Sequence, residues 1–223
     1  MDFKIGLRKN GRVRHIHMLT VKNATAGATI EVTAIILTLN EIDFIEDCIN
    51  HLKPYVDAIL VLDGCSQDGT QEKAVKLGAV VIQEPFRGSF AETRNYAQDL
   101  APTNWVLHID ADERLPEEFL QNIKKIIIES NVKCFRFPRI NLDQTYKHTS
   151  DPQDHQVRLL DKRYGIWQRA VHEVVWSRSL LLNKPLDQCG DAYVKLLDYP
   201  IVHLARPKDT RKKILNRWKT LEG

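Results

Sequence analysis

The stretch TAIILTLNEIDFIEDCINHL, residues 33–52, decides the fold of this chain. Its first part, TAIILTL, is a continuous apolar and β-branched run, which predicts a strand buried on both faces. The part after Asn40 has helical periodicity, and asparagine is a residue type that caps helix N-termini. The apolar face of the predicted helix carries Ile42, Ile45, Ile49 and Leu52. The stretch therefore predicts one strand followed by one helix, the repeating unit of an α/β sheet.

The same unit recurs downstream. After AILVL and the loop DGCSQDGT, the segment QEKAVKL predicts a helix that ends at Gly78. AVVIQ predicts a third strand, Ser89 and Glu92 form a capping box for a helix through Leu100, and WVLHI predicts a fourth strand. Continuous apolar strands that alternate with helices indicate a doubly wound, mostly parallel α/β sheet with helices on both faces.

The expected strand order locates a binding site. Right-handed crossovers give the order 3-2-1-4, so the fourth strand lies beside the first, where the winding of the sheet reverses. Ligands bind at such a switch point, outside the carboxyl ends of the strands. The loops after Leu39 and Ile109, and the loop that starts at Asp63, should therefore line one crevice.

The remaining segments predict one domain with an appendage at each end. Residues 1–28 alternate in polarity around Asn10-Gly11, which predicts a β-hairpin attached to a domain over residues 29–223. The further predicted elements are a helix over 117–130 with Pro116 as a favourable first helical residue, strands at 134–140, 156–160, 171–176 and 200–205, and a basic helix at 208–221.

Composition favours a globular protein with a sizeable core, because 43% of the residues are hydrophobic and the net charge is only +3. No apolar run of about 18 residues and no apolar signal core occur, so we expect a soluble, cytoplasmic protein. The cysteines lack CxxC spacing, which favours reduced thiols over disulfides or zinc. They are Cys48, Cys65, Cys134 and Cys189.

The loop HIDADERL, residues 108–115, carries the chemistry that this crevice suggests. Asp110, Asp112 and Glu113 repel one another at the end of an apolar strand, and a cation would compensate that repulsion. Carboxylate oxygens on a short loop suit Mg²⁺ or Mn²⁺, particularly when a substrate phosphate completes the coordination. The alternative is that Asp112 caps the helix near Pro116 and that its neighbours are solvated.

Two other functions remain open at this point. Haloacid-dehalogenase-like phosphatases use a DxDx[TV] motif, here Asp110 and Asp112, but Arg114 stands where Thr or Val belongs and three strands precede the motif. A nucleic-acid-binding module using the basic termini would need interleaved aromatic residues or a reader motif, and the sequence has neither. No nucleic acid is therefore expected as a partner.

From Thr33 to about Leu120 the sequence resembles the GT-A glycosyltransferases of family 2, especially the bacterial lipopolysaccharide-core type. The matching pieces are AIILTLNE, VLDGCSQDGT, FAETRNYA and LHIDADERL, in that order. QVRLL, AVHEVVW and, more weakly, IVHLARPKDTRKKIL also resemble segments of this type. The second piece departs from the commoner DDGS or DSGS forms, because Gly64 and Cys65 follow Asp63.

The resemblance implies a nucleotide-sugar site in a donor half over about residues 29–115. It implies that Asp63 contacts the base or ribose and that Asp110 faces the ribose and the metal. Asp112 would coordinate the Mn²⁺ or Mg²⁺ that bridges the diphosphate. His203 would close the metal site or touch the diphosphate. The other residues that it places at the donor are Thr38, Asn40, Glu41, Arg94 and Asn95. A UDP-sugar is the favoured donor, with GDP- and dTDP-sugars as alternatives.

The resemblance also implies an acceptor half over about residues 116–223 and transfer with inversion to a hydroxyl of a saccharide or lipid-linked acceptor. A single displacement needs a general base. Glu173 in VHEVV is the first choice, followed by His172, Asp154 and Asp151. The basic helix at 208–221 would either lie on an anionic membrane or be solvated.

Overall fold

The structure is a computed structural model that describes residues 30–86, 88–142, 154–179 and 182–204. The predicted N-terminal hairpin, the basic C-terminal helix and Asp151 lie outside these ranges. Within them, no helix is long and apolar enough to cross a membrane.

The first half alternates strands and helices as the periodicity predicts. Its elements are β1 (Val32–Thr38), α1 (Ile45–Leu52), β2 (Ala58–Asp63), α2 (Thr70–Lys76), β3 (Val80–Gln83), α3 (Phe90–Leu100) and β4 (Trp105–Asp110). The strand order is β3-β2-β1-β4, and all three pairings are parallel. The predicted order 3-2-1-4 is therefore confirmed.

The second half extends this sheet with strands of two to nine residues. Its elements are β5 (Glu113–Arg114), α4 (Glu117–Ser130), β6 (Cys134–Leu142), β7 (His155–Asp161), β8 (Gly165–Gln168), β9 (Val174–Ser177), a 3₁₀ turn η1 (Leu186–Gln188), β10 (Val194–Leu196) and β11 (Ile201–Leu204). The order continues β4-β7-β6-β11-β5, with β7 antiparallel to both of its neighbours. The sequence did not reveal β5, β8 or β10, which are only two to four residues long.

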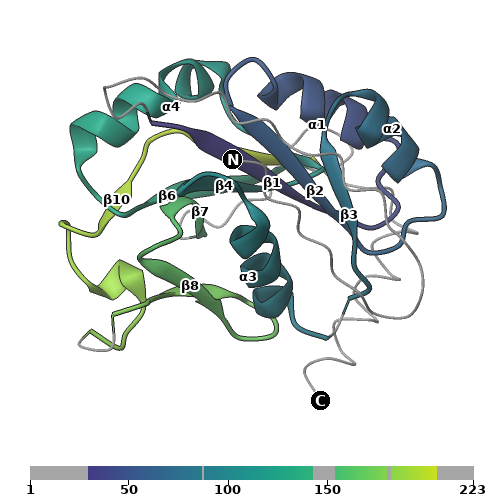
Figure 1. The fold of residues 1–223 in the computed structure, drawn as a ribbon. Coiled ribbons are helices and arrows are strands. Elements are labelled where there is room, and N and C mark those ends of the chain that lie inside the picture. The colour runs from purple at the N-terminus through teal and green to yellow at the C-terminus, as the bar shows by residue number, and fades with distance from the viewer. Residues whose placement is uncertain (1–29, 87, 143–153, 180–181, 205–223) are drawn as a thin grey trace, which may run out of the picture.

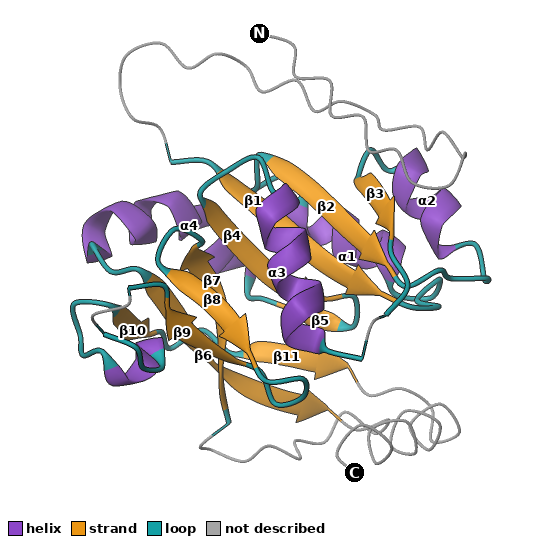
Figure 2. Cartoon of the chain, turned by 60° about the horizontal axis from the view of Figure 1, so that its bottom comes forward, coloured by secondary structure: helices purple, strands orange, loops and turns teal. Residues whose placement is uncertain are grey.

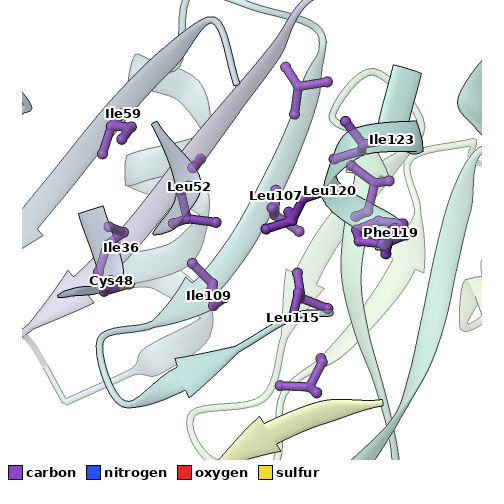
Figure 3. Close-up of a cluster of buried hydrophobic side chains, with 14 of the residues drawn as sticks. Ile36, Cys48, Leu52, Ile59, Leu107, Ile109, Leu115, Phe119, Leu120 and Ile123 are labelled. Atoms are coloured by element: carbon purple, nitrogen blue, oxygen red, sulfur yellow. The ribbon is translucent and has the colours of Figure 1, made fainter. Parts of the chain in front are cut away.

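Two layers cover the sheet. Helices α1, α2 and α4 lie over one face, and α3 with the β8–β9 hairpin lies over the other (Figure 1). Alternate strand residues supply the two cores: Ile36, Leu107 and Ile109 pack against the first layer (Figure 3), and Ile35 and Val106 pack against α3. Burial of each such side chain stabilises the fold by about 1.5–3 kcal/mol.

Two features of the fold differ from the prediction. Helix α1 begins at Ile45, and Asn40 does not cap it. Instead, the Glu41 carbonyl accepts hydrogen bonds from the Phe44 and Ile45 amides in a separate turn, while Asn40 adopts a left-handed backbone with φ 58°. Pro116 is the N-cap of α4 rather than its first residue. Ser89 caps α3 as predicted, by accepting a hydrogen bond from the Glu92 amide at 3.2 Å.

The four cysteines are free thiols. Burial raises the pKa of Cys48 and of Cys134 to about 12, which keeps both side chains protonated at neutral pH. Cys48 lies below the end of β4, with Sγ 4.0 Å from the Asp110 carbonyl oxygen. These two cysteines therefore act as small apolar core residues.

Candidate active site

Three strand ends meet at one edge of the sheet. In the strand register Thr38 is opposite Asp63, and Leu37 is opposite Asp110. The Thr38 hydroxyl donates a hydrogen bond to Asp63 Oδ1 at 3.0 Å, which ties the first two strand ends together. The predicted convergence of the loops after β1, β2 and β4 is therefore present in the structure.

Asp63 organises the loop that follows β2. Its side chain is fully buried and accepts hydrogen bonds from Thr38, from the Ser66 amide at 2.8 Å and from Gln71 Nε2 at 2.7 Å. The Ser66 hydroxyl also donates to it. Asp63 therefore fixes the loop after β2 at the edge of the sheet where the three strand ends meet.

The loop after β1 is locked to the loop after β2. The Asn40 amide donates to Ser66 Oγ at 2.8 Å, and Asn40 Oδ1 accepts from the Gln67 amide at 2.9 Å. Glu41 is buried, and its amide donates to Thr70 Oγ1 at 2.9 Å. These bonds join residues that are 26 to 29 positions apart and hold the two loops as one rigid surface.

Cys65 has a strained backbone within this loop, with φ 71°. The left-handed region costs a non-glycine residue roughly 1–2 kcal/mol, and the commoner DSGS form of this loop has glycine here. We expect Cys65→Gly to be more stable than Cys65→Ala by roughly 1 kcal/mol, because only glycine relieves the strain. Urea unfolding of the two variants measures this difference, and an alanine variant as stable as the glycine variant would contradict it.

Arg114 holds the acidic loop from the outside. Its Nη1 donates to the carbonyl oxygens of Ala111 and Glu113 at 2.8 and 2.7 Å, and its Nη2 lies 2.7 Å from Asp47 Oδ2 of α1. The loop backbone is thereby fastened to the first helix. Arg114, the residue that departs from the phosphatase motif, therefore anchors the acidic loop in the structure.

Arg158 holds the same loop from the inside. Arg158 of β7 donates to Glu113 Oε1 at 2.6 Å, and Glu113 Oε2 accepts a hydrogen bond from the Asp110 amide at 3.0 Å. Arg158 and Glu113 are both buried. Glu113 is therefore an orienting residue of the loop, which the sequence left open. The sequence analysis did not identify Arg158 as a site residue. The feature that could have identified it is the single charged residue inside the otherwise uncharged predicted strand QVRLL.

Asp110 lies between two guanidinium groups. Arg94 Nη2 is 3.2 Å from Asp110 Oδ1, and Arg158 Nη2 is 3.3 Å from Asp110 Oδ2. Burial alone would raise the pKa of Asp110, but the charges of Arg94, Arg158 and Arg139 outweigh burial and hold that pKa well below its ordinary value. Asp110 is therefore ionised at any physiological pH.

Asp112 lies beside His203, whereas Asp110 lies between the two arginines. His203 Nε2 of β11 lies 3.3 Å from Asp112 Oδ2, and His203 Nδ1 lies 2.9 Å from Asn141 Oδ1. The two residues come together because β11 pairs with β5, which begins at the residue after Asp112 (Figure 2). The predicted proximity of His203 to the acidic loop is thus present.

The donor set of this pair fits a divalent cation. The Asn141 oxygen accepts a hydrogen from Nδ1, so in the neutral ring the lone pair of Nε2 faces the Asp112 carboxylate. A cation between two such groups relieves their repulsion. Among the residues that the structure describes, no three His, Cys, Asp or Glu side chains form a ready-made metal site. Ligands from a substrate would have to complete the coordination.

Glu173 lies on the other side of Arg94. Arg94 Nε donates to Glu173 Oε1 at 3.2 Å, so one buried guanidinium joins Glu173 to Asp110. Glu173 follows the tip of the β8–β9 hairpin, where His172 is exposed and has a left-handed backbone with φ 52°. Asp154 lies just before β7, and its Oδ1 accepts a hydrogen bond from Gln156 Nε2.

Comparison with known proteins identifies the family of this chain. The model of the family "Glycosyl transferase family 2" matches residues 33–190. This chain belongs to glycosyltransferase family 2. An uncharacterized glycosyltransferase of Rickettsia conorii is 30% identical over 171 residues, which are 74% of this chain and 60% of that protein. The chain thus spans about 60% of the length of that curated relative.

Solved structures share the fold of this family 2 glycosyltransferase. Glucosyl-3-phosphoglycerate synthase from Mycobacterium tuberculosis, solved with phosphoglyceric acid, superposes with a TM-score of 0.59 at 16% identity over 87% of this chain and 80% of that chain. TarS of S. aureus, solved with UDP-GlcNAc, gives a TM-score of 0.52 at 20% identity over 80% and 59% of the two chains. The predicted GT-A fold is therefore confirmed.

Asn95 of the glycosyltransferase is placed differently from its prediction at the nucleotide. Asn95 Nδ2 donates to the Trp167 carbonyl and Asn95 Oδ1 accepts from the Trp167 amide, both at 2.9 Å. Gln98 Nε2 likewise donates to the Gly165 carbonyl at 3.0 Å. Both ends of the Asn95 amide are thus used to dock the β8–β9 hairpin on α3, and this hairpin leads into Glu173.

His108 gives the glycosyltransferase a measurable pH dependence. Burial, with the charges of Arg94 and Arg158, lowers the pKa of His108 well below its ordinary value of 6.5. The unfolded chain therefore binds a proton near pH 6.5 that the folded chain does not bind. The contribution of His108 to the free energy of unfolding is therefore fully present above that pH and is lost on acidification, at up to about 1.4 kcal/mol per pH unit.

Urea unfolding at several pH values measures this slope. His108→Gln removes the titrating group and keeps a polar side chain beside Trp167, whose Nε1 lies 3.3 Å from His108 Nε2. The variant should be less stable at neutral pH and should have a flatter pH dependence between pH 5 and 7. An unchanged slope would assign the acid sensitivity to another group.

Proposed function

We propose that this family 2 enzyme transfers a sugar from a nucleotide-sugar donor, with a UDP-sugar the favoured class, to a hydroxyl of a saccharide or lipid-linked acceptor, with inversion. The observation that carries the proposal is the approach of Asp112 to His203 at 3.3 Å, beside the meeting point of β1, β2 and β4. Solved neighbours support the donor class: the glucosyl-3-phosphoglycerate synthase was also solved with Mn²⁺ and UDP, and TarS with UDP-GlcNAc. A cytoplasmic location is part of this proposal.

The donor residues of the proposal lie in the half at about residues 29–115. Thr38, Asn40 and Glu41 belong to the rigid wall that Asp63 organises, and the nucleoside would lie against this wall. Arg94 keeps Asp110 ionised and oriented toward the crevice. Asn95 acts through the hairpin that it docks rather than by contact with the nucleotide.

The proposed metal is Mn²⁺ or Mg²⁺, held by Asp112 and His203 with Asp110 nearby. When bound, such a cation neutralises charge on the departing nucleoside diphosphate. Asn141 fixes the ring orientation of His203, and Arg114 and Arg158 fix the loop that carries both aspartates. The protein residues therefore pre-organise the two ligands before substrate binds.

Glu173 is the proposed general base, in the acceptor half at about residues 116–223. Arg94 holds Oε1, and Oε2 makes no hydrogen bond within the described part of the chain. Oε2 takes the proton of the acceptor hydroxyl while that oxygen bonds to the anomeric carbon and the nucleoside diphosphate departs with the electron pair of the broken bond. His172 and Asp154 are the next candidates for this role.

One assay tests the proposed function. The protein is incubated with Mn²⁺ and a panel of UDP-, GDP- and dTDP-sugars, with and without a cell extract as acceptor source, and free nucleoside diphosphate is measured. Release of one nucleoside diphosphate, increased by the extract and abolished by a chelator, is expected. Release of inorganic phosphate without nucleoside diphosphate would contradict the proposal and restore the phosphatase alternative.

A further inference from the structure

Arg139 lies beside the proposed metal residues. In the register of β6 with β11, Arg139 is opposite Ile201 and Asn141 is opposite His203. Residues two apart on a strand point to the same face. Arg139 is therefore on the face of β6 from which Asn141 contacts His203.

The side chain of Arg139 makes no hydrogen bond or ion pair with any described residue, and its Nε is buried without a partner. The other two arginines of the crevice, Arg94 and Arg158, each bind two carboxylates. Arg136, three positions earlier on the same strand, lies 3.9 Å from Asp187. Within the described ranges, Arg139 therefore differs from these neighbouring arginines because it has no anionic partner.

A half-buried guanidinium without a counterion is unfavourable unless something compensates it. Arg139 also lies close enough to Asp110 for its charge to act on that carboxylate. Only Nε of the guanidinium is buried and unpaired, so its terminal nitrogens remain accessible. An incoming ligand can supply the missing partner.

We infer that Arg139 binds an anionic oxygen of a substrate, either a phosphate oxygen of the donor or a phosphate or carboxylate group of the acceptor. The inference rests on the proposed function and adds to it a charged substrate subsite on β6. A guanidinium suits this role because its planar donors match the oxygens of phosphate and carboxylate groups.

The test compares Arg139→Gln and Arg139→Lys with the matched control Arg136→Gln on the same strand. Calorimetry with UDP and with uridine, each in Mn²⁺, forms the first arm. If the donor is the source of the anion, Arg139→Gln weakens UDP binding roughly 10- to 100-fold and leaves uridine binding unchanged. Arg139→Lys should retain part of the affinity, because it keeps the charge and loses the fork geometry.

The second arm titrates inorganic phosphate and acetate into protein already loaded with Mn²⁺ and UDP. Unchanged UDP binding with weakened phosphate or acetate binding in Arg139→Gln assigns the subsite to the acceptor. Unchanged binding in both arms, or equal losses in Arg136→Gln, overturns the inference. A wild-type protein that binds no UDP and releases no nucleoside diphosphate counts against the proposed function instead, so the two failures are distinguishable.

Discussion

Asp112→Asn is expected to weaken UDP binding in the presence of Mn²⁺ by about 100-fold, because it removes the charged oxygen that faces His203. The variant should bind UDP equally with and without Mn²⁺. The fold should survive, because β11 is joined to this position through the Asp112 carbonyl, which accepts the Leu204 amide at 2.8 Å and is unaffected by the change. Calorimetric titration of UDP with Mn²⁺ and with EDTA measures the effect.

A matched control for this change is Asp187→Asn, which removes a carboxylate from η1 near Arg136 and away from the crevice. The control should bind UDP as the wild type does. If Asp112→Asn keeps full affinity for UDP and keeps its metal dependence, then Asp112 is not a metal ligand. The pairing with His203 would in that case be a structural contact of β11.

Glu173→Gln is expected to lower kcat by about 10²- to 10⁴-fold, the range found when a general base is removed. UDP binding should be unchanged, because a glutamine oxygen still accepts the hydrogen that Arg94 Nε donates to this side chain. Arg94 therefore keeps its contact with Asp110, and the donor side of the crevice is preserved. Transfer rate and UDP affinity, measured on the same preparation, separate catalysis from binding.

Glu46→Gln is the control for this variant, since Glu46 lies on the exposed side of α1 and pairs with Lys73 at 2.8 Å. Its turnover should equal that of the wild type. Full turnover by Glu173→Gln would move the base to another residue. His172→Gln and Asp154→Asn would then be the next variants to measure.

The two expectations concern two separate groups of charged side chains beside the acidic loop. Arg94 contacts Glu173 and Asp110, and Arg158 contacts Asp110 and Glu113. Asp112 and His203 form a separate pair at the other side of the acidic loop. A loss of metal binding and a loss of base catalysis can therefore be caused independently, and each variant has its own readout.

Local sequence patterns predicted most of the first half of the fold. The apolar runs at β1, β2 and β4 predicted buried strands, and the periodicity of α1, α3 and α4 predicted helices. Such patterns are visible in the sequence because backbone geometry alone sets these periods. The predicted start of α1 at Asn40 was wrong. The Glu41 carbonyl accepts a hydrogen bond from the Phe44 amide in a separate turn, which the capping preference of asparagine does not predict. The short strands β5, β8 and β10 have too few residues to show any period.

By itself the sequence determined that a parallel sheet is present, that its order places β4 beside β1, and that Asp110 and Asp112 lie at that switch point. These features depend on neighbours along the chain and on the handedness of crossovers. Only the tertiary structure decided that Arg158 supports Glu113, that His203 lies beside Asp112 and that Asn95 docks the β8–β9 hairpin. It also left Nε of Arg139 buried without a partner among the described residues. These contacts join residues 45 to 91 positions apart or depend on the surroundings of a whole strand, so the pairing of β11 with β5 and of β7 with β4 creates them.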